Sequence, residues 1–317
     1  TYYLSQLVLI GIYAVAGAGL MLLCGYCGQI SLGHSAFFAV GAFTTAVLEK
    51  HGIPFPLALL AAGVFAAAVG LVVGLPALRL SGMYLAIATL AAAFIVNEGI
   101  VRWENVTNGA SGIAVPKIRV GGFIADTEPK LYYIVLAVAL LVLMATRNIV
   151  RAPLGLAMMA IRDSETAAQS MGVPLLRTKL TAFGISALFT GFAGALYAHK
   201  IQFIDPDQFT IFVSIEFLVM IFIGGIGSMH GIVLGAIFII ALPQLVAVAK
   251  DHLPAAIAQQ TGLQAAVYAI VLLGFILIEP TGLYGICRKF KHYCSMFPFY
   301  RRGSLRRGKS FAKSETW

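Results

Sequence analysis

Continuous runs of apolar residues recur along the whole chain, and most of them are long enough for a helix to cross a lipid bilayer. A transmembrane helix needs about 20 apolar residues, so a chain of 317 residues has room for about ten. The runs do not alternate with polar residues, which argues against a membrane β-barrel. We predict an all-α, polytopic membrane helix bundle with about nine spans, over residues 3–24, 32–48, 55–78, 83–101, 131–146, 180–199, 212–223, 231–249 and 264–279.

The composition points to the same class. Apolar residues make up 60% of the chain and charged residues only 11%, whereas soluble domains carry about 25% charged residues. Four cysteines are too few for a disulfide framework. Cys24 and Cys27 could form one half of a metal site, and Cys287 and Cys294 the other half. The favoured interpretation is that these small sulfur side chains pack between helices.

Basic residues indicate the side of the membrane on which each loop lies, because Lys and Arg accumulate in the cytoplasm. Placing the loop 150–179 in the cytoplasm also places most of the 22 Lys and Arg residues there. The N-terminal end of the chain is then expected outside and the C-terminal end inside. We predict a transmembrane domain over residues 1–287 and a basic cytoplasmic tail over residues 288–317 that lies on anionic lipid headgroups or on a partner.

The tail contains the letters of a phosphate-binding loop, from Gly303 to Ser310. Such a loop works only between a buried strand and a helix of an α/β domain. The aromatic and basic residues that precede it, Phe297 to Arg302, do not have the pattern of a buried strand. We therefore predict no nucleotide site, no other cofactor and no nucleic-acid partner for this chain.

The segment from Arg151 to Lys179 is the one long polar interruption that has helical character. Strong helix formers fill Leu154 to Met171, Pro153 suits a first helical turn, and Gly172 followed by Pro174 is a stop signal. A polar segment between two spans must contact water or a partner. We predict one short helix that lies outside the bilayer.

Two of the predicted spans carry a small residue at every fourth position, which places these residues on one helix face. Such faces let helix backbones approach closely in lipid. We predict that both are packing faces, formed by Ala58, Ala62, Ala66, Gly70 and Gly74 in one span and by Ala182, Ser186, Thr190, Gly194 and Ala198 in the other.

Two glycine-rich links interrupt the apolar pattern, within residues 25–41 and 224–235. Non-helical backbone at membrane depth is tolerated where it lines a cavity or is buried in protein. One hypothesis is that both links flank the route of a polar or zwitterionic solute. The alternative, which we favour slightly, is that the glycines only permit close helix crossings and that the histidines cap helix ends. The pathway candidates are Gly28, Ser31, Gly33, His34, Gly224, Gly225 and Gly227.

Three carboxylates lie near span ends, at Glu98, Glu216 and Glu279. An ionisable group within a membrane is a functional candidate by default. Glu216 is the best pathway candidate of the three, although a structural pairing is the favoured interpretation. Between the fourth and fifth spans, the external segment has turn-forming pairs and a possible short strand over residues 113–120.

Several motifs together resemble the permease subunits of bacterial branched-chain amino-acid ABC importers, of the LivM-like branch. Each motif alone is weak, but in combination they extend over almost the whole chain. They lie at residues 28–38, 78–87, 160–168, 171–172, 214–216, 224–228 and 234–236.

The resemblance implies a coupling motif that docks into a groove on an ATPase subunit. Glu165 to Ala168 followed by Gly172 is similar to the Glu-Ala-Ala…Gly pattern of importer permeases, with Thr166 as a mild departure. Arg162, Asp163 and Glu165 would then contact the ATPase. Ala167 and Ala168 would pack in its groove, and Gly172 would turn the chain back.

The resemblance also implies partners: a sister permease subunit in a heterodimer, two subunits that bind ATP and Mg, and a periplasmic solute-binding protein. The protein would be located in the inner membrane of a bacterium. The transported solutes would be leucine, isoleucine and valine. An ABC permease for urea, amides or another small polar solute is the first alternative. An ion-coupled secondary transporter that uses Glu216 or His34 is the second. An intramembrane enzyme is disfavoured because the sequence shows no nucleophile and base, no His-Glu-x-x-His and no carboxylate dyad.

Overall fold

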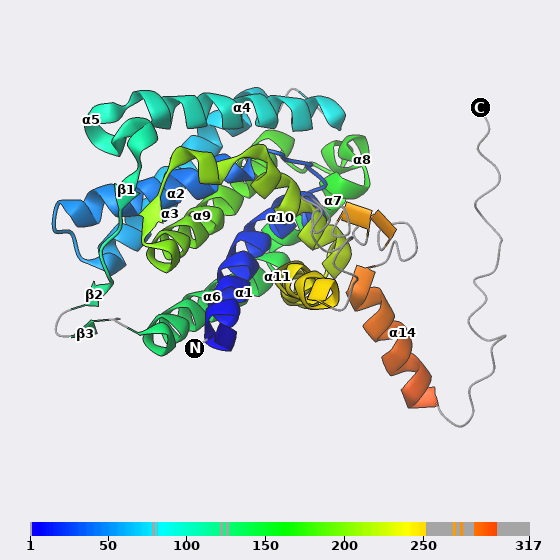
Figure 1. The fold of residues 1–317 in the computed structure, drawn as a ribbon. Helices are drawn as coiled ribbons and strands as arrows, with labels where there is room; N and C mark the ends of the chain where they lie inside the picture. Colours follow the sequence, from blue (N-terminus) through cyan, green and yellow to red (C-terminus); the bar gives the residue numbers. More distant parts are fainter. Residues whose placement is uncertain are drawn as a thin grey trace.

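The computed structural model describes residues 2–77, 80, 82–120, 123–124, 127–251, 269–270, 273–274 and 282–296. Helices dominate these residues (Figure 1). Their bounds are α1 Tyr2–Leu20, the π-helical turn η1 Met21–Tyr26, α2 His34–Lys50, α3 Phe55–Ala77, α4 Met83–Arg102, α5 Glu104–Thr107, η2 Gly109–Ser111, α6 Glu128–Arg151, α7 Pro153–Asp163, α8 Glu165–Ser170, α9 Leu175–Ile201, η3 Pro206–Phe209, α10 Ile211–Gly224, α11 Met229–Asp251 and α14 Gly282–Met296.

Five of the described helices are long and apolar enough to cross a membrane, compared with the nine spans predicted. They cover Tyr2–Tyr26, Phe55–Pro76, Met83–Arg102, Glu128–Arg151 and Leu175–Ile201. Three other predicted spans form shorter helices: α2 has 17 residues, α10 has 14, and the apolar part of α11 ends at Leu245. Both α2 and α10 are shortened by an adjoining glycine link. The predicted span 264–279 lies largely outside the described residues.

Helix α9 lies at the centre of the bundle and packs against α1, α2 and α3 (Figure 1). At one end of the bundle, Lys200 of α9 bonds to Ser5 of α1 and Glu128 of α6. At the other end, Arg162 of α7 bonds to Gly25 of η1. We call the first the strand end and the second the coupling end. Successive long helices therefore run in alternating directions between these two ends.

The small-residue face of α3 packs on α9, as the sequence predicts. Ala58, Ala62 and Ala66 are fully buried there. The predicted face of α9, however, packs on α1 and α2: a Cβ atom at Gly194 would overlap the backbone of Phe38. A second small-residue face of α9, which contains Ala187 and Gly191, meets α3 instead. Because lipid gives apolar helices little reason to associate, this close packing is a main source of cohesion.

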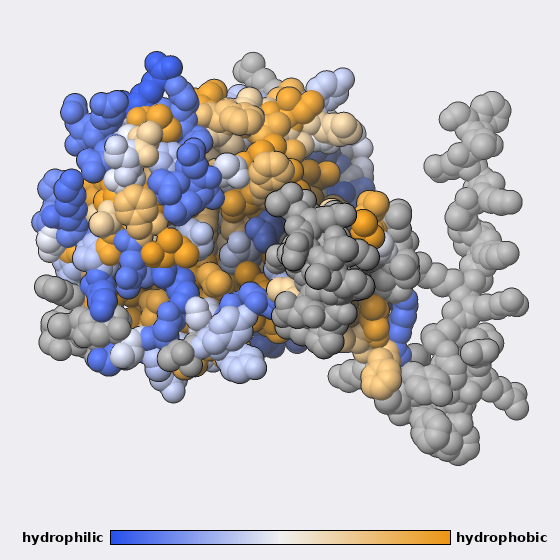
Figure 2. Space-filling model, viewed as in Figure 1, coloured by the Kyte–Doolittle hydropathy of each residue, from blue (hydrophilic) through white to orange (hydrophobic). Residues whose placement is uncertain are grey.

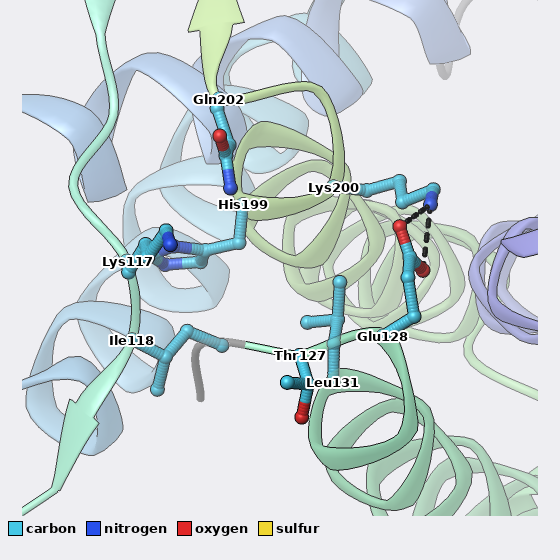
Figure 3. A pocket seen from close by; sticks show the side chains of 8 residues that line it. All are labelled: Lys117, Ile118, Thr127, Glu128, Leu131, His199, Lys200 and Gln202. Carbon is cyan, nitrogen blue, oxygen red and sulfur yellow. Dashed lines mark hydrogen bonds and ion pairs between the residues drawn. The ribbon is translucent and has the colours of Figure 1, made fainter. Parts of the chain in front are cut away.

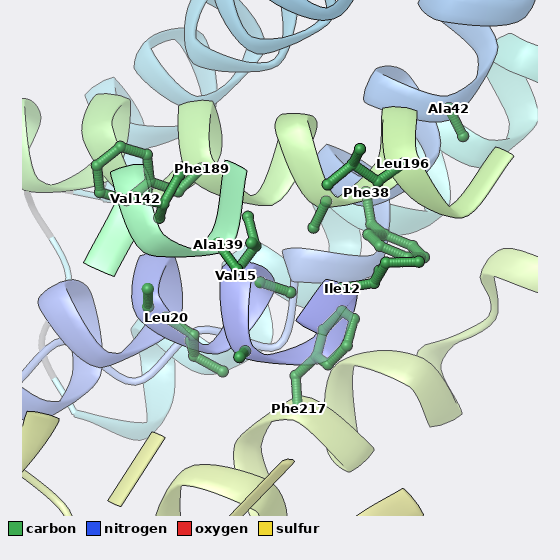
Figure 4. Close-up of a cluster of buried hydrophobic side chains, with 14 of the residues drawn as sticks. Ile12, Val15, Leu20, Phe38, Ala42, Ala139, Val142, Phe189, Leu196 and Phe217 are labelled. Atoms are coloured by element: carbon green, nitrogen blue, oxygen red, sulfur yellow. The ribbon is translucent and has the colours of Figure 1, made fainter. Parts of the chain in front are cut away.

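Larger apolar side chains fill the space between α1, α2, α6, α9 and α10 (Figure 4). At its centre, the Phe38 ring meets Phe217 and Tyr197 at centroid distances of 5.3 and 5.0 Å. Aromatic pairs at such angles and distances add to the stability of a core. Residues from all five helices contribute, among them Ile12, Val15, Leu20, Phe38, Ala42, Ala139, Val142, Phe189, Leu196 and Phe217.

Two short antiparallel strand pairs lie at the strand end. Strand β1 Ile113–Ala114 pairs with β4 Phe203–Ile204, and β2 Arg119–Val120 pairs with β3 Phe123–Ile124. The predicted strand at 113–120 is therefore two strands in two pairs. Figure 2 shows hydrophilic residues gathered over this end and hydrophobic residues over α4, which is the surface expected of a membrane protein.

Candidate functional site

The polar segment at the coupling end forms two helices, where the sequence predicts one. Helix α7 begins at Pro153, as predicted, but ends at Asp163. Ser164 has an extended backbone, with φ −163° and ψ 117°, and its Oγ accepts a hydrogen bond from the amide of Ala167. Ser164 is thus the N-cap of α8, a role that serine favours. Gly172, with φ +82°, turns the chain back as predicted.

The inner face of these two helices packs on the chain's own core. Met158 and Ile161 of α7 are buried, and Ala168 of α8 is 3% exposed. Ala168 therefore contacts its own chain, not the outer surface where a partner's groove would lie, which corrects the expectation from the family motif. Ala167 and Thr166 are exposed on the opposite face.

An ion pair holds α8 against the start of α9. Lys179 Nζ lies 2.7 Å from Glu165 Oε1, and the Lys179 side chain is 5% exposed while that of Glu165 is 38% exposed. A buried ammonium requires such a partner. Glu165 therefore has an internal contact that its predicted role at an ATPase surface does not include.

Arg162, whose side chain is 38% exposed, reaches from α7 to both glycine links. Its Nη1 donates to the carbonyl oxygen of Gly25 at 3.0 Å, and its Nε and Nη2 donate to Asp163 Oδ1 at 3.2 and 3.1 Å. A Cβ atom at Gly28 would lie 2.9 Å from Arg162 Cγ, and one at Gly227 would lie 3.5 Å from Nη1. The structure thus brings together the predicted coupling residues and part of the predicted pathway set.

His34 and Ser31 form a buried polar cluster with α9. The His34 ring is fully enclosed, with Nδ1 3.1 Å from Ser31 Oγ and Nε2 2.8 Å from Ser186 Oγ. Hydroxyl groups both donate and accept, so either tautomer of the ring is satisfied. Gly33 fits against the backbone of Thr89. These contacts hold the ring of His34 between α2 and α9, and its place on a solute pathway stays a prediction.

The second link allows a close crossing of α10 and α11. A Cβ atom at Gly224 would overlap the carbonyl of Gly231, so only glycine fits there. Gly225 and Gly227 have φ values of +112° and +77°, which favour glycine. Ser228 Oγ donates to the Gly225 carbonyl and accepts from the amide of Gly231, which caps α11.

Glu216 lies on α10, apart from both links. Its Oε2 accepts a hydrogen bond of 3.2 Å from the hydroxyl of Tyr13 on α1, and its side chain is half-buried. This is the pairing that the sequence favours for Glu216. The predicted pathway residues therefore occupy three places: the His34 cluster, the coupling end and the Tyr13 contact.

A cavity of about 90 Å³ lies at the strand end (Figure 3), where the sequence predicts no site. Lys200 Nζ lies on its wall, but it donates to both oxygens of Glu128 and to Ser5 Oγ at 2.7–2.8 Å. All three of its protons are therefore used within the chain. The lining residues are Lys117, Ile118, Thr127, Glu128, Leu131, His199, Lys200 and Gln202.

Beside this cavity, the buried ring of His199 faces the buried carboxylate of Glu49, at a distance but not an angle that suits a hydrogen bond. The ring Nδ1 lies 3.1 Å from the carbonyl oxygen of Pro116, and Nε2 lies 3.1 Å from Glu49 Oε1. Sequence reasoning missed this pair because its members are 150 residues apart and neither belongs to a motif.

Replacing Glu49 by methionine is expected to destabilise the bundle by roughly 2–3 kcal/mol, because the buried Nε2 of His199 loses the polar group that lies 3.1 Å away. Glu49→Gln is expected to retain most of the stability, since an amide N–H can donate to a neutral ring. Thermal unfolding of the detergent-solubilised protein measures the difference. The control is Glu98→Met, which removes an exposed pair with Arg102 and should change little. Equal melting temperatures for Glu49→Met and wild type would contradict the prediction.

Comparison with known proteins identifies the family. The family model described as branched-chain amino acid transport system, permease component, matches residues 2–279. The chain belongs to this family. Two relatives of this permease are the high-affinity branched-chain amino acid transport system permease proteins LivM of Escherichia coli (strain K12) and Salmonella typhimurium. They are 37% identical over 261 residues and 36% identical over 259 residues, each over 74% of this chain.

Similarity to a permease named for another solute is more limited. The autoinducer 2 import system permease protein LsrC of an Enterobacter species is 31% identical over 110 residues, which are 33% of this chain and 32% of LsrC. No solved structure matches the chain.

The chain spans about 61% of the length of the two LivM relatives. Its family is a transport permease component, not a catalytic one. Together with the five long apolar helices, the family establishes a multi-pass integral membrane protein of the LivM-like permease type.

Proposed function

We propose that this chain is the permease subunit of an ATP-binding-cassette importer that carries leucine, isoleucine and valine across the inner membrane of a bacterium. The family match over residues 2–279 is the single observation that carries this proposal. The relatives named as high-affinity branched-chain amino acid permeases support the solute class. ATP and Mg bind to separate ATPase subunits, which supply the energy.

The surface of α7 and α8 is proposed to receive the ATPase. This surface is exposed, and it is fixed to the bundle by the Glu165–Lys179 pair and the contacts of Arg162. Because these helices are fixed in this way, they can move with the ATPase and stay attached to the bundle. The exposed residues of the two helices are Pro153, Leu156, Arg162, Asp163, Thr166, Ala167, Gln169 and Ser170, and Met171 and Gly172 follow them.

The remaining partners follow from the same proposal. A sister permease subunit completes a heterodimer in the bilayer, and a periplasmic solute-binding protein delivers the solute. The coupling loop 150–179 and the basic tail 288–317 then lie in the cytoplasm, and residues 1–287 form the transmembrane permease domain.

Uptake of radiolabelled leucine into liposomes tests the solute class. The vesicles contain this chain with its sister subunit and ATPases, and the binding protein is added outside. We expect ATP-dependent uptake that unlabelled isoleucine and valine inhibit at equal concentration and that urea and acetamide leave unchanged. Inhibition by urea or acetamide, with no effect of isoleucine or valine, would instead assign the alternative solute class.

A further inference from the structure

The guanidinium of Arg162 lies at the meeting point of α7, the π-helical turn η1 and the second glycine link. A π-helical turn changes the usual pairing of backbone groups. An α-helix would direct the amide of Gln29 to the carbonyl of Gly25, but this amide donates to Leu23 at 3.0 Å. Arg162 Nη1 supplies the donor to Gly25 instead, at 3.0 Å. The irregular end of the first span is thus completed by a side chain 137 residues away.

Both glycine links lie against one side of this side chain, the rest of which is exposed. Gly28 has φ +72° and lies so close to Arg162 that a Cβ atom would be 2.9 Å from its Cγ. Gly227 has φ +77°, and a Cβ atom there would be 3.5 Å from Nη1 and 3.8 Å from the Gly25 carbonyl oxygen. Glycine is the residue that adopts such φ values without strain. The two links therefore contact each other and Arg162 at one point.

Asp163 fixes the guanidinium relative to the outer surface. It accepts bonds from Nε and Nη2 of Arg162, and it is the last residue of α7 before the break at Ser164. Buried Met158 and Ile161 hold the rest of α7 to the bundle. A displacement of the junction between α7 and α8 therefore carries the guanidinium, and with it the Gly25 carbonyl.

We infer that Arg162 is the positioning residue that transmits movement of α7 and α8 to both glycine links. The inference rests on the proposed function, because the movement comes from the ATPase. Arg162 acts inward in this role, whereas the family motif assigns it to the ATPase surface. A guanidinium suits the task because its planar fork bonds to two partners at a fixed angle, which the ammonium of lysine does not.

Arg162→Lys separates the two roles, since it keeps the charge and removes the fork. Leucine uptake and ATP hydrolysis are measured together in liposomes that hold the complete complex. We expect the number of leucine molecules taken up per ATP to fall about tenfold, the size of effect that losing one charge-assisted hydrogen bond has on an equilibrium. The ATPases should still co-purify and hydrolyse ATP. Arg177→Lys, at an exposed position in the first turn of α9, should keep the wild-type ratio.

Gly28→Ala provides a second variant, and it decides the question if Arg162→Lys does not accumulate. It directs a methyl group at Arg162 and should lower the same ratio. Its control is Gly52→Ala, where φ is also positive, +81°, but nothing lies within 4 Å of the added atom. A wild-type ratio in Arg162→Lys, or loss of the ATPases from that complex, would overturn the inference. Absence of ATP-driven uptake by the wild-type complex would instead overturn the proposed function.

Discussion

Glu165→Arg is expected to lower leucine uptake far more than tenfold while the subunit stays in the membrane. The substitution places a guanidinium against Lys179, whose side chain is 5% exposed and whose present partner lies 2.7 Å away. An uncompensated buried charge costs about 3–5 kcal/mol, which is enough to displace the six-residue helix α8. The ATPase would then lose a fixed surface on which to act. Uptake into membrane vesicles, normalised to the amount of subunit present, measures the effect.

The charge swap Glu165→Arg with Lys179→Glu is the matched control. It restores an ion pair at the same place, so it should recover at least part of the uptake. Recovery would show that Glu165 acts by holding α8 to α9. A swap variant that assembles with the ATPases but takes up no leucine would contradict this, and would place the role of Glu165 at the ATPase surface.

Gly194→Ala is expected to cost about 1–3 kcal/mol or more of stability, so that little folded protein accumulates. The added Cβ atom would overlap the carbonyl oxygen of Phe38. It would lie 2.9 Å from the carbonyl carbon of Phe38 and 3.0 Å from the amide nitrogen of Ala42. All three atoms belong to the backbone of α2, so α9 and α2 would have to separate. Thermal unfolding in detergent and the yield of monodisperse protein measure the change.

Gly99→Ala is the control for Gly194→Ala. Gly99 lies within α4, and nothing lies within 4 Å of an atom added there. Alanine favours a helix over glycine by about 0.5–1 kcal/mol, so Gly99→Ala should be neutral or slightly stabilising. Similar melting temperatures for the two variants would mean that the contact between α9 and α2 contributes little to the fold.

The sequence predicts the features that depend on short-range chemistry. Apolar runs predict the membrane helices, and the small residues of α3 predict a packing face that the structure confirms. Pro153 and Gly172 mark the start and the end of the helical part of the polar segment correctly, because each has a backbone preference of its own. The fold class and the limits of this segment were therefore predictable.

Features that depend on distant contacts were not predictable in the same way. Ser164 divides the polar segment through its extended backbone and its cap on α8, and the π-helical turn at Met21–Tyr26 is completed by a hydrogen bond from Arg162. Ala168 has the composition of a groove-filling residue, yet it packs inward. The two glycine links were predicted separately, but nothing in their local sequence indicates that they meet at one guanidinium.

Solute accumulation by vesicles with and without an ATP-hydrolysing partner tests the central claim most directly, namely that this chain receives its energy through α7 and α8. The complete complex with ATP inside the vesicles is expected to accumulate leucine against its gradient. This chain with its sister subunit alone, under an imposed proton or sodium gradient, is expected to accumulate none. Accumulation by the permease subunits without the ATPases would contradict the account.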